Sequence, residues 1–413
     1  MSRMRTFSTA LLLAALVLLP LVARGQTTDM MTVEDIAFDE SGATIAVRVE
    51  AGILLHDASD EVTFLCASAW ETAGAEAQWL FQTGPGRPLL TGAQGPFLAL
   101  ESGCEWARIS GPADSAKVVG VHAIEPGGDA LLFAVSSGFG PDEILRTDDG
   151  GFTSASAGGF AQLDKNLTGL VGDGDTVVVS GVGVVSSAWV AWVSEDAGES
   201  FAALDLDTEE GGELIGLGGQ TLWLGEGANL SAYDLQTGAQ VMTLQPEGAS
   251  VAHMVTPDGA LWWAESGGRL RYEDPHSGSG ESYDIAVTAL AQQGESTWVG
   301  LQAEQPGDPL LMRLDSGAES WSVARHRPSV WSYPEGCQTL QAQQCADDSA
   351  LLLPHEVDDP DPEPVASTSP DGGCSGTSGA SGFPLELYIF LMLGFAVRLL
   401  RASSRNGSRS ASP

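Results

Sequence analysis

The chain has 413 residues, with 55 acidic against 18 basic side chains and a formal net charge of −37. This length permits a sizeable core, and an apolar content of 43% excludes a generally disordered chain. The excess of negative charge argues against binding to nucleic acid or to an anionic lipid surface, because the phosphates would be repelled. Seven basic residues lie in the two end segments, namely Arg3, Arg5, Arg24, Arg398, Arg401, Arg405 and Arg409.

Residues 1–25 have the layout of a secretory signal peptide. Arg3 and Arg5 precede an apolar run over residues 11–22, and small residues follow that run. Cleavage after Gly25 would start the mature protein at Gln26. The sequence therefore predicts that the protein is exported.

Between residues 26 and 350 one pattern recurs, a short apolar strand that begins after a Gly, Asp or Ser turn. The seven predicted strands are Thr44–Val49, Pro96–Leu100, Ala130–Val135, Thr176–Ser180, Thr221–Gly225, Ala260–Ala264 and Ser296–Gly300. They start about 42 residues apart on average, and further short apolar segments flank each one. Four short strands per unit of this length are typical of a propeller blade. The sequence thus predicts an all-β, seven-bladed β-propeller over residues 26–350.

We interpret the recurring strands as the innermost strands of the blades. Five of them have a small residue at the fifth position, as expected where strands converge on a central channel: Ala134, Ser180, Gly225, Ala264 and Gly300. Their aromatic side chains are interpreted as core between neighbouring blades: Phe133, Trp223, Trp262, Trp263 and Trp298. For one of the paired tryptophans, Trp262 or Trp263, a carbohydrate-stacking platform is the alternative.

One internal motif stands out in the repeat region, and it reads Ser194-Glu-Asp196-Ala-Gly198-Glu-Ser200-Phe201. It resembles the Asp-box (BNR) hairpin, S-x-D-x-G-x-T/S-W/F, of sialidase-type, sortilin-type and related propellers. The resemblance implies a peripheral turn in which the Asp carboxylate and Ser hydroxyl bond the backbone, Gly takes a positive φ and the aromatic packs into the blade. A weaker copy contains Asp149 and Gly151, and a third, degraded copy spans residues 315–321.

The Asp-box resemblance raises the possibility of sialidase chemistry, which needs three arginines to clamp a carboxylate together with a nucleophile and an acid. None of the nine arginines between residues 26 and 397 has the expected Arg-Ile/Leu-Pro context, and Arg87-Pro88 lacks the middle residue. The six histidines show no HxxxH or HExxH spacing, and no GxSxG motif occurs. The sequence therefore predicts no catalytic, cofactor or metal site.

The C-terminal region has three parts. Residues 351–382 form an acidic linker rich in Pro, Ser and Gly, which is too polar to bury a core. Residues 383–400 are apolar apart from Glu386 and Arg398, and residues 401–413 are basic. On hydropathy alone a buried terminal helix is a rival, but these flanks favour a transmembrane helix with a cytoplasmic tail.

This tripartite end, in which Cys374-Ser375-Gly376 precedes the apolar helix and an Arg-rich tail, resembles the myxobacterial C-terminal sorting signal (MYXO-CTERM). The resemblance covers residues 371–413 and implies delivery to the cell surface or outer membrane, with removal of the signal by an envelope sorting protease. It also implies that Cys374 is the processed or anchored residue. The arginines here are spaced by Ser, Ala and Asn instead of being clustered.

The chain has five cysteines, so one remains unpaired when the others form disulfides, and we assign that place to Cys374. Export to an oxidising environment favours structural disulfides. Cys337 and Cys345 lie close together in the sequence and are predicted to pair. Cys66 and Cys104 are then the second pair.

These features predict an exported, surface-displayed, non-catalytic propeller that works as a recognition or interaction module. Its partner would be a surface protein or a glycan, contacted through blade-top loops, and no cofactor is expected. Two alternatives stay open. One is an assembly scaffold for another envelope protein, and the other is a glycosidase or lyase-type enzyme that uses the axial pocket.

Overall fold

The computed structural model describes most of residues 31–333 and, after them, residue 345. The described residues are 31–59, 61–71, 78–83, 87–92, 95–100, 105–109, 117–125, 127–136, 141–162, 165–208, 211–318, 320–333 and 345. The predicted signal peptide, linker, C-terminal helix and basic tail lie outside these residues, as do Cys104, Cys337 and Cys374.

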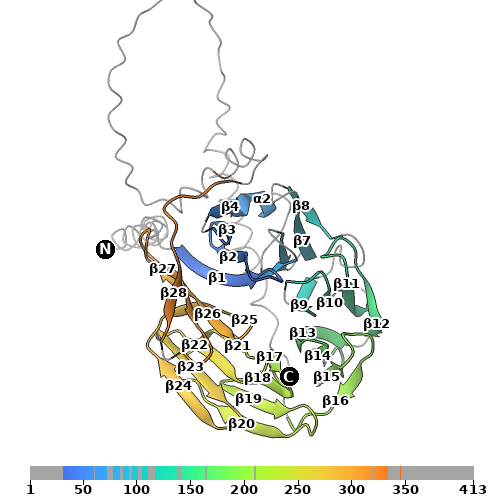
Figure 1. The fold of residues 1–413 in the computed structure, drawn as a ribbon. Helices are drawn as coiled ribbons and strands as arrows, with labels where there is room; N and C mark the ends of the chain where they lie inside the picture. The colour runs from blue at the N-terminus through green and yellow to red at the C-terminus, as the bar shows by residue number, and fades with distance from the viewer. Residues whose placement is uncertain are drawn as a thin grey trace, which may run out of the picture. The chain divides into compact units, whose positions relative to one another are not determined.

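Five antiparallel sheets of four consecutive strands form separate blades (Figure 1). The first two contain β5 (Trp79–Gln82), β6 (Pro88–Gly92), β7 (Gly95–Leu100) and β8 (Glu105–Arg108), then β9 (Lys117–Ala123), β10 (Leu131–Ser136), β11 (Asp142–Thr147) and β12 (Ala155–Gln162). The third contains β13 (Lys165–Asp173), β14 (Thr176–Gly183), β15 (Trp189–Ser194) and β16 (Ala202–Leu204). The last two contain β17 (Glu213–Gly218), β18 (Thr221–Glu226), β19 (Asn229–Asp234) and β20 (Gln240–Leu244), then β21 (Ser250–Val255), β22 (Leu261–Glu265), β23 (Arg269–Asp274) and β24 (Ser279–Tyr283).

The remaining eight strands come from the two ends of the repeat region and form one continuous sheet, in the order β28-β27-β26-β1-β2-β3-β4 with β25 paired to β26. They are β1 (Met31–Phe38), β2 (Ile45–Val49), β3 (Gly52–His56), β4 (Val62–Cys66), β25 (Val287–Gln293), β26 (Ser296–Ala303), β27 (Pro309–Leu314) and β28 (Ser322–His326). Both β1 and β26 run past their hairpin partners, and the free ends pair with each other, Met31 opposite Ala303 and Thr32 opposite Gln302.

The prediction of a seven-bladed propeller is therefore wrong. Five four-stranded blades are separate, and backbone pairing of β1 with β26 merges the other eight strands into one sheet. The predicted C-terminal helix, residues 383–400, is outside the described residues. Within the described part of the chain, the one helix is α2 (Ala67–Glu71), and no helix is long and apolar enough to cross a membrane.

The seven apolar strands predicted from the sequence lie in β2, β7, β10, β14, β18, β22 and β26. Their interpretation as innermost strands is wrong, since the first strands of neighbouring sheets contact one another around the axis. The apolar strands are second or third in their sheets, so they have strands on both edges and neighbouring sheets on both faces. Burial on every side explains why they are the most hydrophobic segments of the chain.

The core lies between adjacent sheets. Trp223 of β18 and Trp263 of β22 share one buried cluster, and the indole Nε1 of Trp223 donates a hydrogen bond of 2.9 Å to the Gly259 carbonyl oxygen. Trp262 is also buried, and its ring packs against those of Tyr272 and Trp321. The interpretation of these aromatics as inter-blade core is confirmed, and burial of both tryptophans excludes the carbohydrate platform.

A disulfide joins Cys66, at the end of β4, to Cys345, with the Cα atoms 5.6 Å apart across a sequence separation of 279 residues. The predicted pairs Cys66–Cys104 and Cys337–Cys345 are therefore wrong. The physical reason is that the chain after β28 returns to the outer edge of β4. The backbone N–H of Phe64 donates to the Ser332 carbonyl oxygen at 2.8 Å, and the Ser332 N–H donates to the Val62 carbonyl oxygen at 2.9 Å.

Candidate axial binding pocket

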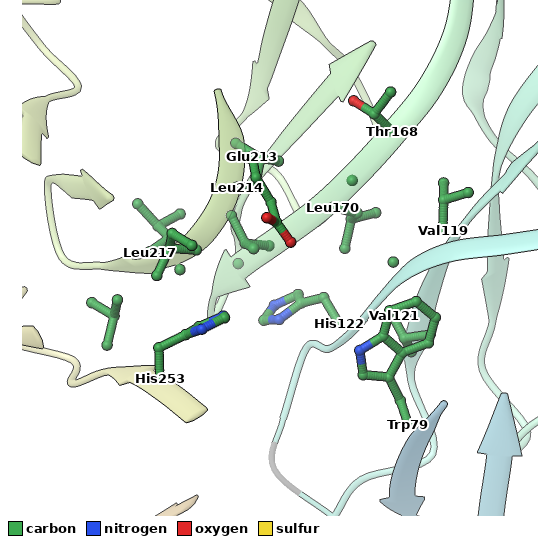
Figure 2. Close-up of a pocket in the computed structure, with 17 residues that line it drawn as sticks. Trp79, Val119, Val121, His122, Thr168, Leu170, Glu213, Leu214, Leu217 and His253 are labelled. Carbon is green, nitrogen blue, oxygen red and sulfur yellow. The ribbon is translucent and has the colours of Figure 1, made fainter. Parts of the chain in front are cut away.

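The first strands of several blades surround a pocket of about 390 Å³ (Figure 2). Its walls come from β9, β13, β17 and β21, and Trp79 of β5 completes it. Most of the lining is aliphatic side chain and glycine backbone. Three titratable side chains from different strands, His122, Glu213 and His253, are also part of the wall.

Each of β9, β13 and β17 has a β-bulge at the pocket. The register shifts leave one extra residue in each first strand, Val119, Thr168 and Ile215 respectively. A bulge takes the extra residue out of the hydrogen-bonded ladder and bends the strand. All three bulged residues line the pocket, so the bulges provide backbone groups and a bend at the place where a ligand would lie.

Close approach of the first strands requires glycine beside the pocket. A Cβ atom on Gly120 of β9 would lie 2.5 Å from the backbone nitrogen of Leu170 in β13. A Cβ atom on Gly172 of β13 would lie 2.7 Å from the imidazole of His122. These distances are far below van der Waals contact, so the glycines allow the strands to bring their polar groups together.

The electrostatics of the pocket depend on two neutral imidazoles and one carboxylate. Burial lowers the pKa of His122 below its usual value, against the opposing effect of a 2.8 Å hydrogen bond from Nε2 to the Gly174 carbonyl oxygen and of nearby Asp173 and Asp175. Desolvation by the pocket walls also lowers the pKa of His253, and Glu213 opposes that shift. Both rings are therefore uncharged at neutral pH, and Figure 2 shows them pointing into the space beside the Glu213 carboxylate.

The imidazoles and the carboxylate of the pocket can accept hydrogen bonds, and its aliphatic side chains can contact an apolar group. Within the described residues, no group of three or more His, Cys, Asp and Glu side chains has an arrangement that could hold a metal ion. The pocket volume lies within the range of ordinary small-ligand sites, and its exposed wall is more polar than apolar.

The Asp-box residues predicted from the sequence lie away from this pocket, in the turn between β15 and β16. The Ser194 hydroxyl donates to Asp196 Oδ1 at 2.8 Å and accepts from the Gly198 N–H at 2.8 Å. Asp196 also accepts from the backbone N–H of Ser200 at 2.8 Å and from its hydroxyl at 2.6 Å. Hydrogen bonds from Ser200 and Ser194 lower the pKa of Asp196 to about 2.

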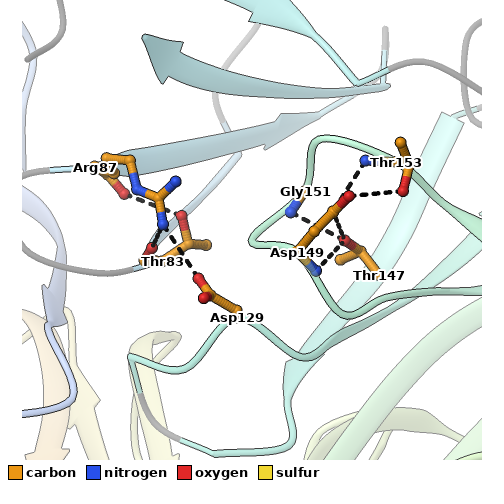
Figure 3. A network of polar contacts seen from close by, with 7 residues as sticks. All are labelled: Thr83, Arg87, Asp129, Thr147, Asp149, Gly151 and Thr153. Carbon is orange, nitrogen blue, oxygen red and sulfur yellow. Dashed lines mark hydrogen bonds and ion pairs between the residues drawn. The ribbon is translucent and has the colours of Figure 1, made fainter. Parts of the chain in front are cut away.

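The turn between β11 and β12 repeats this pattern, with Thr147 in the place of Ser194. Asp149 accepts from the Thr147 hydroxyl at 2.7 Å, from the Thr153 N–H at 3.0 Å and from the Thr153 hydroxyl at 2.7 Å (Figure 3). Desolvation raises the pKa of Asp149, but the hydrogen bonds from Thr153 and Thr147 outweigh it and bring the value to about 2. In the third copy Asp315 instead accepts from Ser296 and Arg313.

Both aspartate turns contact the preceding blade. A Cβ atom on Gly198 would lie 3.0 Å from the Leu132 side chain in β10, and Arg146 Nη1 donates to the Ala197 carbonyl oxygen at 3.2 Å. A Cβ atom on Gly151 would meet Ile109 at 2.7 Å. The aromatic of the first turn, Phe201, packs against the Phe160 ring with centroids 4.8 Å apart. The turns therefore act as joints between neighbouring blades.

Arg87 reinforces the second joint from the preceding blade. Its Nη2 donates to the Thr83 carbonyl oxygen at 2.7 Å and to Asp129 Oδ1 at 3.2 Å (Figure 3). The guanidinium also lies over the Phe152 ring, 5.5 Å from its centroid. The arginine nearest to a sialidase context thus makes contacts between blades.

Sequence reasoning missed the three titratable residues of the pocket, because no motif or spacing relates His122, Glu213 and His253. The signal that could have found these residues is their position within the repeat. Each lies in the first strand of its blade, in the segment just before the turn that precedes an apolar strand. Such segments alternate polar, glycine and aliphatic residues, and their role appears only when the blades are arranged around an axis.

Comparison with known proteins gives no family: no family model and no curated protein matches the chain. Similar solved structures include YCF48 bound to a D1 peptide, with 17% identity and a TM-score of 0.39 over 58% of this chain and 78% of that chain. PorZ, an essential surface component of the type-IX secretion system of Porphyromonas gingivalis, has 12% identity and a TM-score of 0.47 over 71% of this chain and 38% of PorZ. U3-55K has 9% identity and a TM-score of 0.45 over 67% of this chain and 89% of that chain.

The fold and the site together define a β-propeller with an axial pocket. Its ring contains five four-stranded blades and one eight-stranded sheet. The chain spans 38% of the PorZ chain that it resembles.

Proposed function

We propose that this protein is an exported, surface-displayed, non-catalytic recognition module that binds part of a partner protein in the axial pocket. The proposal of export rests on the signal-like segment 1–25. The proposal of surface display rests on Cys374 and on the apolar and basic segments that follow it. The binding step rests on the pocket.

The observation that supports binding is the shape and chemistry of that pocket. A cavity of about 390 Å³ is formed by first strands of four blades and by Trp79, with bulged backbone at Val119, Thr168 and Ile215. Rigid strands hold these groups in place without a ligand, so little ordering is needed when a partner binds.

The polar groups of the pocket are suited to holding a ligand. The Nε2 atom of His122 is occupied by the Gly174 carbonyl oxygen. His253 and Glu213 interact electrostatically, but no hydrogen bond joins their side chains among the described contacts. A general base must lie within hydrogen-bond reach of the proton that it moves and is usually oriented by a partner. His122 has such a partner in Gly174, but neither His253 nor Glu213 has one among the described contacts, so we assign this set to recognition.

The experiment fills the pocket and measures partner capture. Thr168 is exposed and lines the pocket, so Thr168→Trp adds bulk there, whereas Thr243→Trp adds the same bulk on the exposed outer strand β20. Crosslinked cell envelopes carrying each full-length variant are analysed by affinity capture and mass spectrometry. We expect wild type and Thr243→Trp to capture the same protein and Thr168→Trp to lose it.

Equal capture by both tryptophan variants would contradict axial binding. A mature chain that still begins at Met1 would contradict export through a cleaved signal, and the same mass spectra report this terminus. Turnover of a glycan pool by the wild-type protein that Thr168→Trp abolishes would favour the glycosidase or lyase alternative.

A further inference from the structure

The pocket contains an acid without a cationic partner among the described residues. Glu213 begins β17, its side chain is exposed within the pocket, and it takes part in none of the described ion pairs, which involve the acids of other turns and strands. An uncompensated carboxylate in a partly enclosed site attracts positive charge more strongly than one on an open surface.

The two imidazoles beside it add hydrogen-bond acceptors. Because a carbonyl oxygen can only accept, His122 Nε2 carries the proton that it donates to Gly174. In the neutral ring, His122 Nδ1 is then left as an acceptor. His253 is neutral as well, since desolvation lowers its pKa, and a neutral imidazole offers one acceptor nitrogen. At neutral pH the three side chains thus provide acceptors and a net charge of about −1.

The apolar part of the wall would suit a short aliphatic stem. Val119 and Ile215 line the pocket and are only partly buried, and Trp79 contributes an aromatic surface. The whole chain has a formal net charge of −37, which favours the approach of cations over anions.

Building on the proposed function, we infer that the pocket binds a primary ammonium group on a short apolar stem. The lysine side chain of a partner protein has this chemistry, and so does a free alkylamine. The ammonium offers three N–H donors, which match the Glu213 carboxylate and the acceptor nitrogens of His122 and His253.

Acid should weaken this binding. His122 faces the Gly174 carbonyl together with Asp173 and Asp175, and His253 faces Glu213. As the pH falls, both rings gain a proton, lose their acceptor nitrogens and change the net charge of the three side chains from about −1 to about +1. An ammonium ligand would then be repelled.

The direct test uses three probes of similar size, n-butylammonium, n-butanol and butyrate, with saturation-transfer NMR and calorimetry on the full-length protein at fixed ionic strength. We expect n-butylammonium to bind and the other two to show no saturable binding. Glu213→Gln should weaken n-butylammonium binding at least tenfold, as for loss of a charged hydrogen-bond partner. Glu195→Gln makes the same charge change on the exposed peripheral turn and should leave binding unchanged.

Equal binding of the three probes, or equal effects of Glu213→Gln and Glu195→Gln, would overturn the assignment. Each variant is checked by its melting temperature, so that loss of fold is not read as loss of binding. Affinity should fall as the pH is lowered below 6.5, the ordinary imidazole pKa, and the fall should shrink in His253→Asn. A pH-independent affinity would overturn the acceptor role of the imidazoles.

A second pair of probes separates the two sources of the ammonium group. Acetyl-Gly-Lys-Gly-amide and its norleucine analogue differ only in the terminal ammonium of the side chain. Preference for the lysine peptide over n-butylammonium would support a partner lysine, whereas binding of n-butylammonium alone would support a free alkylamine. If Thr168→Trp abolishes partner capture while none of the cations binds, the recognition function stands and the ammonium assignment fails.

Discussion

The eight-stranded sheet and the five separate blades differ in how neighbouring units are joined. In the eight-stranded sheet the joint is backbone hydrogen bonding between β1 and β26, and the Cys66–Cys345 disulfide ties its outer edge to the chain that follows β28. The separate blades are joined by side-chain packing, by close approaches at glycine and by the two aspartate turns.

The pocket lies on the side that is joined by packing. Its lining residues come from β5, β9, β13, β17 and β21, and none comes from the eight-stranded sheet. Bulged first strands occur on both sides of the ring, since β1 and β25 of the eight-stranded sheet have register shifts as well. The comparison indicates that one side of the ring serves closure and the other forms the binding wall.

The largest effect is expected from breaking the covalent closure. Cys66→Ser removes a crosslink across a sequence separation of 279 residues, which the chain-entropy model values at about 5.6 kcal/mol. We expect the melting temperature to fall by many degrees, measured by calorimetry under non-reducing conditions. Cys345→Ser should match it, because it breaks the same bond. A melting temperature that stays at the wild-type value in either variant would contradict this closure.

A smaller loss is expected from a joint between separate blades. Gly120→Ala places a Cβ atom 2.5 Å from the backbone nitrogen of Leu170, so β9 and β13 must move apart. Overpacking of this kind costs about 1–3 kcal/mol in unfolding free energy, measured by chemical denaturation. Gly267→Ala is the matched control, since a Cβ atom there has no heavy atom within 4 Å. Equal stability of the two variants would mean that the first strands tolerate more separation than the packing indicates.

The smallest effect is expected at a peripheral aspartate turn. Asp196→Ala removes the acceptor for the Ser200 N–H and hydroxyl and should lower the melting temperature at pH 7, while Glu195→Ala in the same turn should not. The pKa of Asp196 is about 2, below the ordinary 3.8. Its contribution is therefore full above pH 3.8 and disappears as the pH falls through 2.

Thermal scans at pH 7 and near pH 2 test the direction of this pH dependence. The difference in melting temperature between wild type and Asp196→Ala should shrink at the lower pH. A difference that is the same at both pH values would indicate that the ionised carboxylate is not what stabilises the turn.

Local features were predictable from the sequence because they depend on neighbouring residues. The apolar strands are found in β2, β7, β10, β14, β18, β22 and β26, since each contains a run that only a buried strand accommodates. The order of residues around Asp196 specifies a turn, since a carboxylate can reach N–H groups two to four residues away. The inward side of each blade was not predictable, because a second strand and an innermost strand look alike when neither neighbour is known.

The sequence by itself determined the all-β class, the blade-forming strands and the aromatic inter-blade core, all of which follow from hydrophobic periodicity and short-range turn chemistry. Tertiary structure alone decided three features that depend on residues far apart in the chain. Overhanging ends of β1 and β26 merged two sets of four strands, and ring closure brought Cys66 to Cys345. Convergence of first strands placed His122, Glu213 and His253 around one pocket. Contacts of this kind leave no spacing in the sequence, because their geometry is set by how the blades close around the axis.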